Sequence, residues 1–191
     1  MAKFQLNYEI PEETQETHVP YKEYIEWIET IVFAFFAVLL IFTFIVRQVN
    51  VDGESMLPTL ENGEKLIVHH IGYTPERGDI VIVDSLNLGK PIVKRVIAVG
   101  GDTIDINFET GEVKLNGTVL DEPYIKDPTK LDEGGQTYPV TVPSGYYFVM
   151  GDNRMDSLDS RSERVGLVST DEIAGKVIYR IYPGTKIGTV Q

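Results

Sequence analysis

The chain has 191 residues, no cysteine and a formal net charge of −12 at pH 7. This charge argues against a nucleic-acid partner, because binding a polyphosphate needs clustered lysine and arginine. The absence of cysteine excludes a disulfide framework, a thiol nucleophile and a zinc–cysteine site. The length suits one folded domain behind a short N-terminal segment, and no motif in it calls for a cofactor.

The N-terminal part is predicted to be a tail followed by a helix. Residues 1–19 are acidic and polar without an apolar period, which is typical of a disordered tail. Pro20 suits the first turn of a helix. Tyr21, Tyr24 and Trp27 then follow at spacings of three, which resembles the aromatic belt of a membrane helix. An amphipathic surface helix is the alternative.

Residues 31–46 contain no charged side chain, and with their flanks they approach the roughly 20 residues that a membrane span needs. We therefore predict an interfacial and transmembrane helix over residues 20–47. A cleaved secretory signal fits less well, because the preceding flank is acidic and no small-x-small cleavage site follows. Lys22 and Arg47 nearly balance, so charge alone does not orient the helix.

Ser55 is the first candidate for chemistry. Val49 and Val51 alternate with polar residues as in a half-buried strand, and Gly53 then lets the backbone turn so that Ser55 faces a cleft. A serine hydroxyl needs a neighbouring base to become a nucleophile. Without a partner, this stretch is most simply an ordinary serine at the end of a strand.

Lys94 is the second candidate. In the strand expected at residues 91–99 it shares a face with Ile92 and Val96, so apolar side chains would surround its amine. Desolvation lowers the pKa of a lysine, as a general base requires. From this segment alone, a lysine that extends outward from an edge strand is the simpler explanation of the pattern.

The rest of residues 48–191 is predicted to be all-β. A continuous apolar run at residues 80–83 indicates a strand buried on both faces, and Asn116-Gly117 between apolar residues predicts a hairpin. Residues 103–143 are expected to form a small inserted β subdomain. Further strands are predicted at 65–71, 145–150 and 173–181.

The segment 151–161 has the composition of a solvated loop, and equally of a site held by buried ion pairs between Asp152 or Asp159 and Arg95 or Arg161. His69 and His70 are adjacent in a strand and point to opposite faces, so they cannot jointly bind one metal. No metal site is predicted.

Taken together, four motifs resemble those of bacterial type I signal peptidases, in the same order and at matching spacing. They lie behind an N-terminal anchor and cover nearly all of residues 28–181. The motifs are Ser55-Met56-x-Pro58-Thr59, Arg77-Gly78-Asp79-Ile80-Val81, Lys94-Arg95-Val96-Ile97 with Gly101-Asp102, and Gly151-Asp152-Asn153 with Ser157-x-Asp159-Ser160-Arg161.

The resemblance implies a serine–lysine protease with coiled antiparallel sheets, held at the outer face of the cell membrane by a single helix, with residues 1–19 in the cytoplasm. It would cut N-terminal signal peptides from exported preproteins after small residues of the Ala-x-Ala type, and it would contact membrane lipid. By carry-over, Ser55 is the nucleophile, Lys94 the general base, and Ser157 a hydrogen-bond partner of the lysine amine; Asp152 pairs with Arg95 and Asp159 with Arg161.

The resemblance also implies shallow pockets for the −1 and −3 residues of the signal peptide, lined by Val49, Val51, Met56, Ile92 and Val93. One departure stands out. Some family members carry a hydroxyl residue two positions before the nucleophile as an oxyanion donor, whereas Gly53 stands here and leaves the Ser55 backbone N–H as the expected donor. The single anchor and small subdomain resemble the shorter Gram-positive members.

Three other hypotheses compete. A self-cleaving repressor-type protease uses the same pair of residues, but its Ala-Gly cleavage site precedes the serine, and here Ala174-Gly175 follows it. A membrane-tethered β-domain that binds a protein without catalysis would not need both Ser55 and Lys94. A Ser-His-Asp site would have to use His69 or His70.

Overall fold

The computed structural model describes residues 20–84 and 88–190. The chain divides into two compact units, Met1–Leu40 and Ile41–Gln191. The tail expected at residues 1–19 lies outside the described residues.

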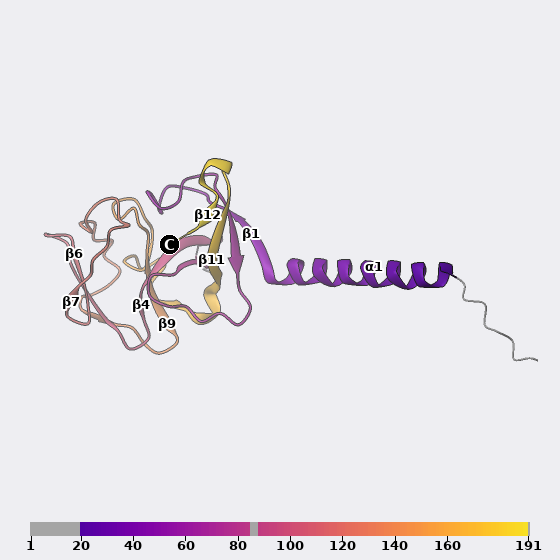
Figure 1. Cartoon of the computed structure of the whole chain (residues 1–191). Helices are drawn as coiled ribbons and strands as arrows, with labels where there is room; N and C mark the ends of the chain where they lie inside the picture. Colours follow the sequence, from indigo (N-terminus) through magenta and orange to yellow (C-terminus); the bar gives the residue numbers. More distant parts are fainter. Residues whose placement is uncertain (1–19, 85–87, 191) are drawn as a thin grey trace, which may run out of the picture. The chain divides into compact units, whose positions relative to one another are not determined.

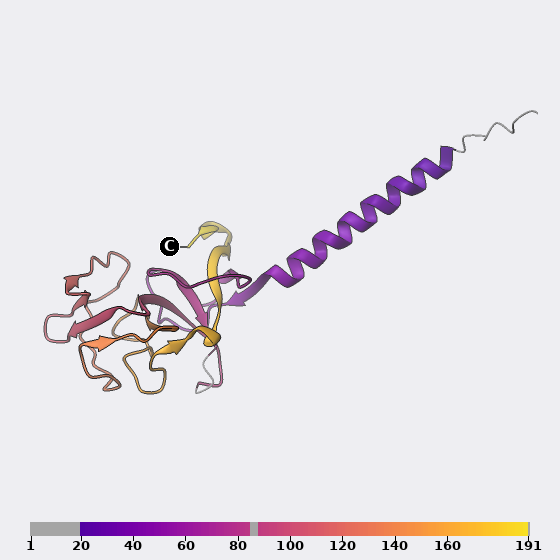
Figure 2. The same cartoon turned by 90° about the horizontal axis from the view of Figure 1, so that it is seen from below.

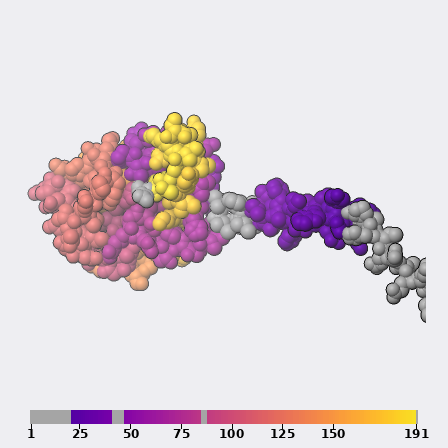
Figure 3. Space-filling view, viewed as in Figure 1, coloured from indigo at the N-terminus to yellow at the C-terminus, as the bar shows by residue number. Residues whose placement is uncertain are grey.

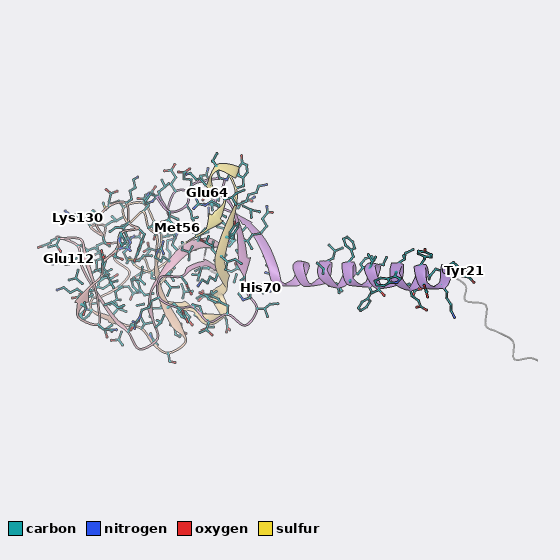
Figure 4. All side chains as sticks on the ribbon, in the orientation of Figure 1. Tyr21, Met56, Glu64, His70, Glu112 and Lys130 are labelled. Carbon is teal, nitrogen blue, oxygen red and sulfur yellow. The ribbon has the colours of Figure 1, made fainter. Side chains whose placement is uncertain are left out.

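Helix α1 runs from Pro20 to Ile45, over most of the predicted 20–47 segment. Between positions 21 and 40 its large apolar side chains are exposed, as Figure 4 shows for Tyr21, and Trp27 is 69% exposed. Within the part of the chain that the structure describes, no helix combines the length and the hydropathy of a membrane span. The transmembrane role of residues 20–47 stays a prediction.

The second unit is built on a large antiparallel sheet with the strand order β1-β2-β11-β3-β4-β9-β10, and β12 pairs with β11. Figures 1 and 2 show that this sheet curls. Register shifts occur in β11 against both β2 and β3, and between β4 and β9. Such bulges increase the twist of a strand. The strands are β1 (Val46–Asn50), β2 (Lys65–His69), β3 (Ile80–Val83), β4 (Ile92–Val99), β9 (Tyr146–Met150), β10 (Val168–Ser169), β11 (Ile173–Tyr182) and β12 (Gly188–Thr189).

A smaller sheet lies within residues 103–143, where the sequence predicts an inserted β subdomain. Its strand order is β7-β6-β5-β8. Asn116 and Gly117 connect β6 to β7 with φ angles of +53° and +83°, which is the backbone that an Asn-Gly hairpin turn requires. The strands are β5 (Thr103–Asn107), β6 (Glu112–Leu115), β7 (Thr118–Val119) and β8 (Val140–Thr141); two short 3-10 turns, η1 (Thr170–Glu172) and η2 (Gly184–Lys186), flank β11.

Strand β3 is buried on both faces, which confirms the interpretation of its apolar run. Ile80 and Ile82 pack into one hydrophobic cluster together with Met56. Val81 and Val83 pack into another cluster on the opposite face. Because β4 pairs directly with β3, Lys94 emerges from a strand whose neighbour has no solvated face.

The C-terminal segment is attached to the turn that follows the Ser55 stretch. Lys186 Nζ lies 2.5 Å from a Glu61 carboxylate oxygen, and Arg180 Nη1 lies 2.6 Å from Glu64 Oε1. Figure 3 shows the last residues of the chain, in yellow, at the surface of the second unit. These two ion pairs therefore link the C-terminal segment to the turn that precedes β2.

Removal of residues 1–45 is expected to leave a folded domain, because β1 begins at Val46 and the buried cores use residues from position 51 onward. The truncated protein should keep a single cooperative thermal transition by circular dichroism. Removal of residues 1–50 also deletes edge strand β1 and should lower the transition temperature. A non-cooperative transition in the 46–191 fragment would contradict the independence of this unit.

Candidate active site

Ser55 lies in a tight turn after β1. Gly53 adopts a φ of +105°, which is readily available only to glycine, and its N–H donates to Asn62 Oδ1 at 3.0 Å. Beyond the serine, Leu60 N donates to Met56 O at 2.9 Å. Met56 is 1% exposed and points into the core, where Figure 4 labels it. The buried methionine anchors the turn in the core, and the adjacent Ser55 lines a groove.

Lys94 reaches Ser55 from the neighbouring wall of the groove. Its side chain is only 2% exposed. Lys94 Nζ lies 2.7 Å from Ser55 Oγ and 2.9 Å from Val93 O. Burial lowers the pKa of Lys94 to about 8, against the opposing charges of Asp159 and Glu133. The structure therefore brings together a serine hydroxyl and an amine whose pKa is well below that of a solvated lysine.

The loop 151–161 completes the site because β9 and β4 run antiparallel. Met150, the last residue of β9, pairs with Arg95, so the loop begins beside Lys94. Asn153 N donates to Ser55 O at 3.0 Å, and Asn153 Nδ2 donates to Glu54 O at 3.1 Å. The loop thus holds the backbone of the nucleophile turn directly.

Asp152 joins the nucleophile turn to the strand that carries the lysine. Arg95 donates to both of its carboxylate oxygens at 2.8 and 2.7 Å, and both side chains are buried. The Thr59 hydroxyl donates to the same carboxylate. The Arg95 guanidinium also lies over the Tyr124 ring, 4.0 Å from its centroid. Sequence reasoning did not assign Thr59 or Tyr124, although the motif around Ser55 contains Thr59.

Asp159 has the contacts that the resemblance assigned to it, but Ser157 does not. Arg161 donates to Asp159 Oδ1 at 2.8 Å and to Oδ2 at 2.9 Å, with both side chains fully buried. Ser157 Oγ donates its hydrogen to Asp159 Oδ2 at 2.7 Å. The resemblance implied a hydrogen bond between Ser157 and the Lys94 amine, whereas the structure shows Lys94 Nζ bonded to Ser55 and Val93 and Ser157 bonded to Asp159. A hydroxyl has one proton to donate, and an ionised carboxylate is the stronger acceptor.

A groove of about 590 Å³ runs past Ser55 and Lys94. All of the predicted pocket residues line it, namely Val49, Val51, Met56, Ile92 and Val93. Besides Lys94, charged side chains also line it, namely Asp52, Glu54, Lys90, Asp156 and Arg164. Among the described residues no group of acidic or histidine side chains is arranged to hold a metal ion. His69 and His70 are not part of the groove lining, so a histidine-based site has no support here.

The sequence was compared with known protein families and structures. The model of the family described as signal peptidase, peptidase S26, matches residues 24–182. The chain belongs to the signal peptidase family. Family membership makes the chain a serine endopeptidase.

Several signal peptidases are similar to this chain. A signal peptidase I from Bacillus licheniformis is 39% identical over 165 residues, which cover 82% of this chain and 87% of that protein. A signal peptidase IB from Staphylococcus aureus is 38% identical over 167 residues, covering 78% of this chain and 85% of that protein. A crystal structure of a signal peptidase I from Enterococcus faecalis is 29% identical, with a TM-score of 0.45, and covers 55% of this chain and 97% of that one.

The backbone at Gly151 packs tightly against Ser157 and the backbone of Ser55. A Cβ at position 151 would collide with Ser157 Oγ and with the backbone carbonyl oxygen of Ser55, so Gly151→Ala should displace the nucleophile. Misplacement of a reacting group by about 1 Å costs roughly 10²-fold in rate, and we expect kcat for preprotein cleavage to fall by about that factor. Gly184→Ala is the matched control, since a Cβ there meets no atom within 4 Å. Equal activity of both variants would contradict this packing.

Proposed function

We propose that this chain is a membrane-bound endopeptidase that cleaves signal peptides from exported preproteins, with Ser55 as nucleophile and Lys94 as general base. The observation that carries the proposal is the 2.7 Å separation between Lys94 Nζ and Ser55 Oγ in a groove lined by both apolar and charged side chains. Hydrogen-bond contact between a nucleophile and its base is the geometry that nucleophilic catalysis requires.

The chemistry follows from the protonation state of Lys94. The neutral amine takes the proton of Ser55 as Oγ bonds to the scissile carbonyl carbon. The resulting ammonium then returns the proton to the leaving amine as the C–N bond breaks, which leaves an acyl-serine. A water molecule, deprotonated by the same amine, attacks the acyl group and releases Ser55. Since Lys94 has a pKa of about 8, both of its forms are accessible near neutral pH.

The oxyanion of the tetrahedral intermediate is proposed to bind the backbone N–H of Ser55. Among the hydrogen bonds of residues 20–84 and 88–190, none uses this N–H as a donor, so it is available to a substrate. Gly53 cannot contribute its own N–H in this arrangement, because that group donates to Asn62. A serine at position 53 would also have to adopt the φ of +105° that glycine adopts there.

Cleavage after small residues of the Ala-x-Ala type is proposed from the shape of the groove beside Ser55. Its walls are branched or long apolar side chains, as at Val49, Val51 and Ile92. Such walls favour short apolar side chains of the substrate by burying them. Bulky side chains would have to displace residues that are themselves packed in the core, such as Met56.

The membrane anchor is proposed to be the helical segment within residues 20–47, with the catalytic domain on the extracytoplasmic side. Residues 31–46 carry no charge, and the apolar side chains of α1 at positions 31–40 are mostly exposed. A helix that is apolar around its whole circumference needs an apolar environment. Lipid and signal-peptide-bearing preproteins are the partners that this arrangement implies.

Ser55→Ala and Lys94→Ala should each abolish cleavage of a preprotein by the detergent-solubilised protein, with sequencing of the new N-terminus as the assay. The two residues act as a unit, so the double variant should be no worse than either single one. Lys94→Arg should be equally inactive, because a guanidinium stays protonated. Substantial turnover by either alanine variant, with the thermal transition preserved, would end the proposal.

Activity should fall with acid through the pKa of Lys94. Burial lowers that pKa to about 8, and only the neutral amine accepts a proton, so activity is present above this pH and is lost as the pH falls through it. The pH dependence of kcat/KM measures the apparent pKa of this loss of activity on the acidic side. If this apparent pKa lies near 10 instead, Lys94 behaves as a solvated lysine and is not the base.

A further inference from the structure

Asn153 makes two hydrogen bonds to the nucleophile turn, one to each of the two peptide units that flank the Cα atom of Ser55. Its backbone N–H donates to Ser55 O at 3.0 Å. Its side-chain Nδ2 donates to Glu54 O at 3.1 Å. When both peptide planes beside one Cα are held, the φ and ψ angles between them are fixed as well. The directions of the Ser55 N–H and of its side chain are therefore set in large part by one residue of the 151–161 loop.

The side-chain bond acts on the proposed oxyanion donor, because Glu54 O and the Ser55 N–H belong to the same peptide unit. In a trans peptide the C=O and the N–H point in opposite directions. Leu57 N also donates to Glu54 O, at 3.1 Å, but this bond lies within the turn and moves with it. Only the Asn153 amide ties this peptide unit to the rest of the site. Donation to the carbonyl also polarises the peptide and strengthens its N–H as a donor.

Asn153 is itself held in a rigid place. Its side chain is buried, and the residues before and after it both belong to buried ion pairs. Asp152 pairs with Arg95, and Arg154 pairs with Glu122. The amide of Asn153 is thus oriented before a substrate arrives. Donors that are fixed in advance stabilise a developing charge most, because they need no reorganisation during the reaction.

We infer that Asn153 is a positioning residue of the oxyanion site, whose side-chain amide holds the Glu54–Ser55 peptide unit so that the Ser55 N–H meets the oxyanion. The inference rests on the proposed function of Ser55 and Lys94. As Ser55 Oγ bonds to the scissile carbon, the π electrons of the carbonyl move to its oxygen and the serine proton passes to Lys94. Loss of an entire oxyanion donor costs roughly 10²–10³ in kcat. Loss of the orientation of that donor should cost less.

The first test is the kinetics of preprotein cleavage by the detergent-solubilised full chain carrying Asn153→Leu. Leucine has a similar shape but no donor, and the backbone N–H at position 153 can still donate to Ser55 O. We expect kcat to fall by about 10- to 100-fold with little change in KM, because the bond to the oxyanion exists only in the transition state. The apparent pKa of kcat/KM on the acidic side should not change, since Asn153 carries no charge.

A pair of inhibitors separates the orientation of the oxyanion donor from general damage to the groove. A peptide aldehyde of the Ala-x-Ala type adds reversibly to Ser55 Oγ and carries its oxygen where the oxyanion forms, whereas the matching peptide alcohol forms no such bond. In Asn153→Leu the aldehyde Ki should rise by about the factor by which kcat falls, and the alcohol Ki should stay within about twofold. Asn62→Ala is the matched control, because it removes the acceptor of the Gly53 N–H in the same turn but contacts neither peptide unit of Ser55. Its ratio of the two Ki values should equal that of the parent protein.

Equal losses of affinity for the aldehyde and the alcohol in Asn153→Leu would overturn the inference, because the amide would then only support the shape of the groove. An unchanged kcat, or an equal change of the Ki ratio in Asn62→Ala, would overturn it too. Should Asn153→Leu not fold, the Ki ratio of Asn153→Ala decides in the same way. Failure of the proposed function looks different: the parent protein would bind the aldehyde no more tightly than the alcohol, and Ser55→Ala would retain activity.

Discussion

The burial of the Lys94 amine is the constraint on which the rest of the site depends. A cation removed from water is costly, so the protein must either pair the amine with a carboxylate or let it become neutral. Lys94 Nζ contacts the Ser55 hydroxyl and the Val93 carbonyl, and no ion pair of the described residues includes it. The two neighbouring aspartates are instead paired with arginines. A direct lysine–carboxylate pair would have stabilised the ammonium and removed the base.

Antiparallel strand pairing produces the buried surroundings of the Lys94 amine. The register of β4 with β9 places the start of loop 151–161 beside Lys94. The buried strand β3 covers the other side of β4. The turn after β1 is then held by Asn153 through its backbone and by Asp152 through Thr59. Arg95 and Asp152 form a buried ion pair, so loss of one partner would leave an uncompensated charge next to the base. Positioning and electrostatics at this site therefore depend on the same residues.

The departure at Gly53 has a geometric explanation. Family members with a hydroxyl residue two positions before the nucleophile use its side chain as a donor, whereas here the backbone at that position has a φ of +105° and its N–H is engaged by Asn62. A left-handed turn at this point lets Ser55 face the groove while Val51 and Met56 stay in the core. The glycine thus serves the turn, and the proposed donor is the backbone N–H of Ser55.

The sequence by itself determined many of the local elements and the set of candidate reacting residues, because strand periodicity, the Asn-Gly hairpin turn and the ordered motifs are all encoded at short range. The burial of β3 on both of its faces could likewise be predicted from its four consecutive apolar residues. Only the tertiary structure decided whether Lys94 is buried or extends into solvent, since a strand alone does not reveal what covers it. It also decided that Ser157 donates to Asp159 and that Thr59 binds Asp152. Such contacts depend on which hydrogen-bond acceptors the folded chain brings within reach of each donor. These groups can lie far apart in the chain, so residue spacing does not predict which of them will pair.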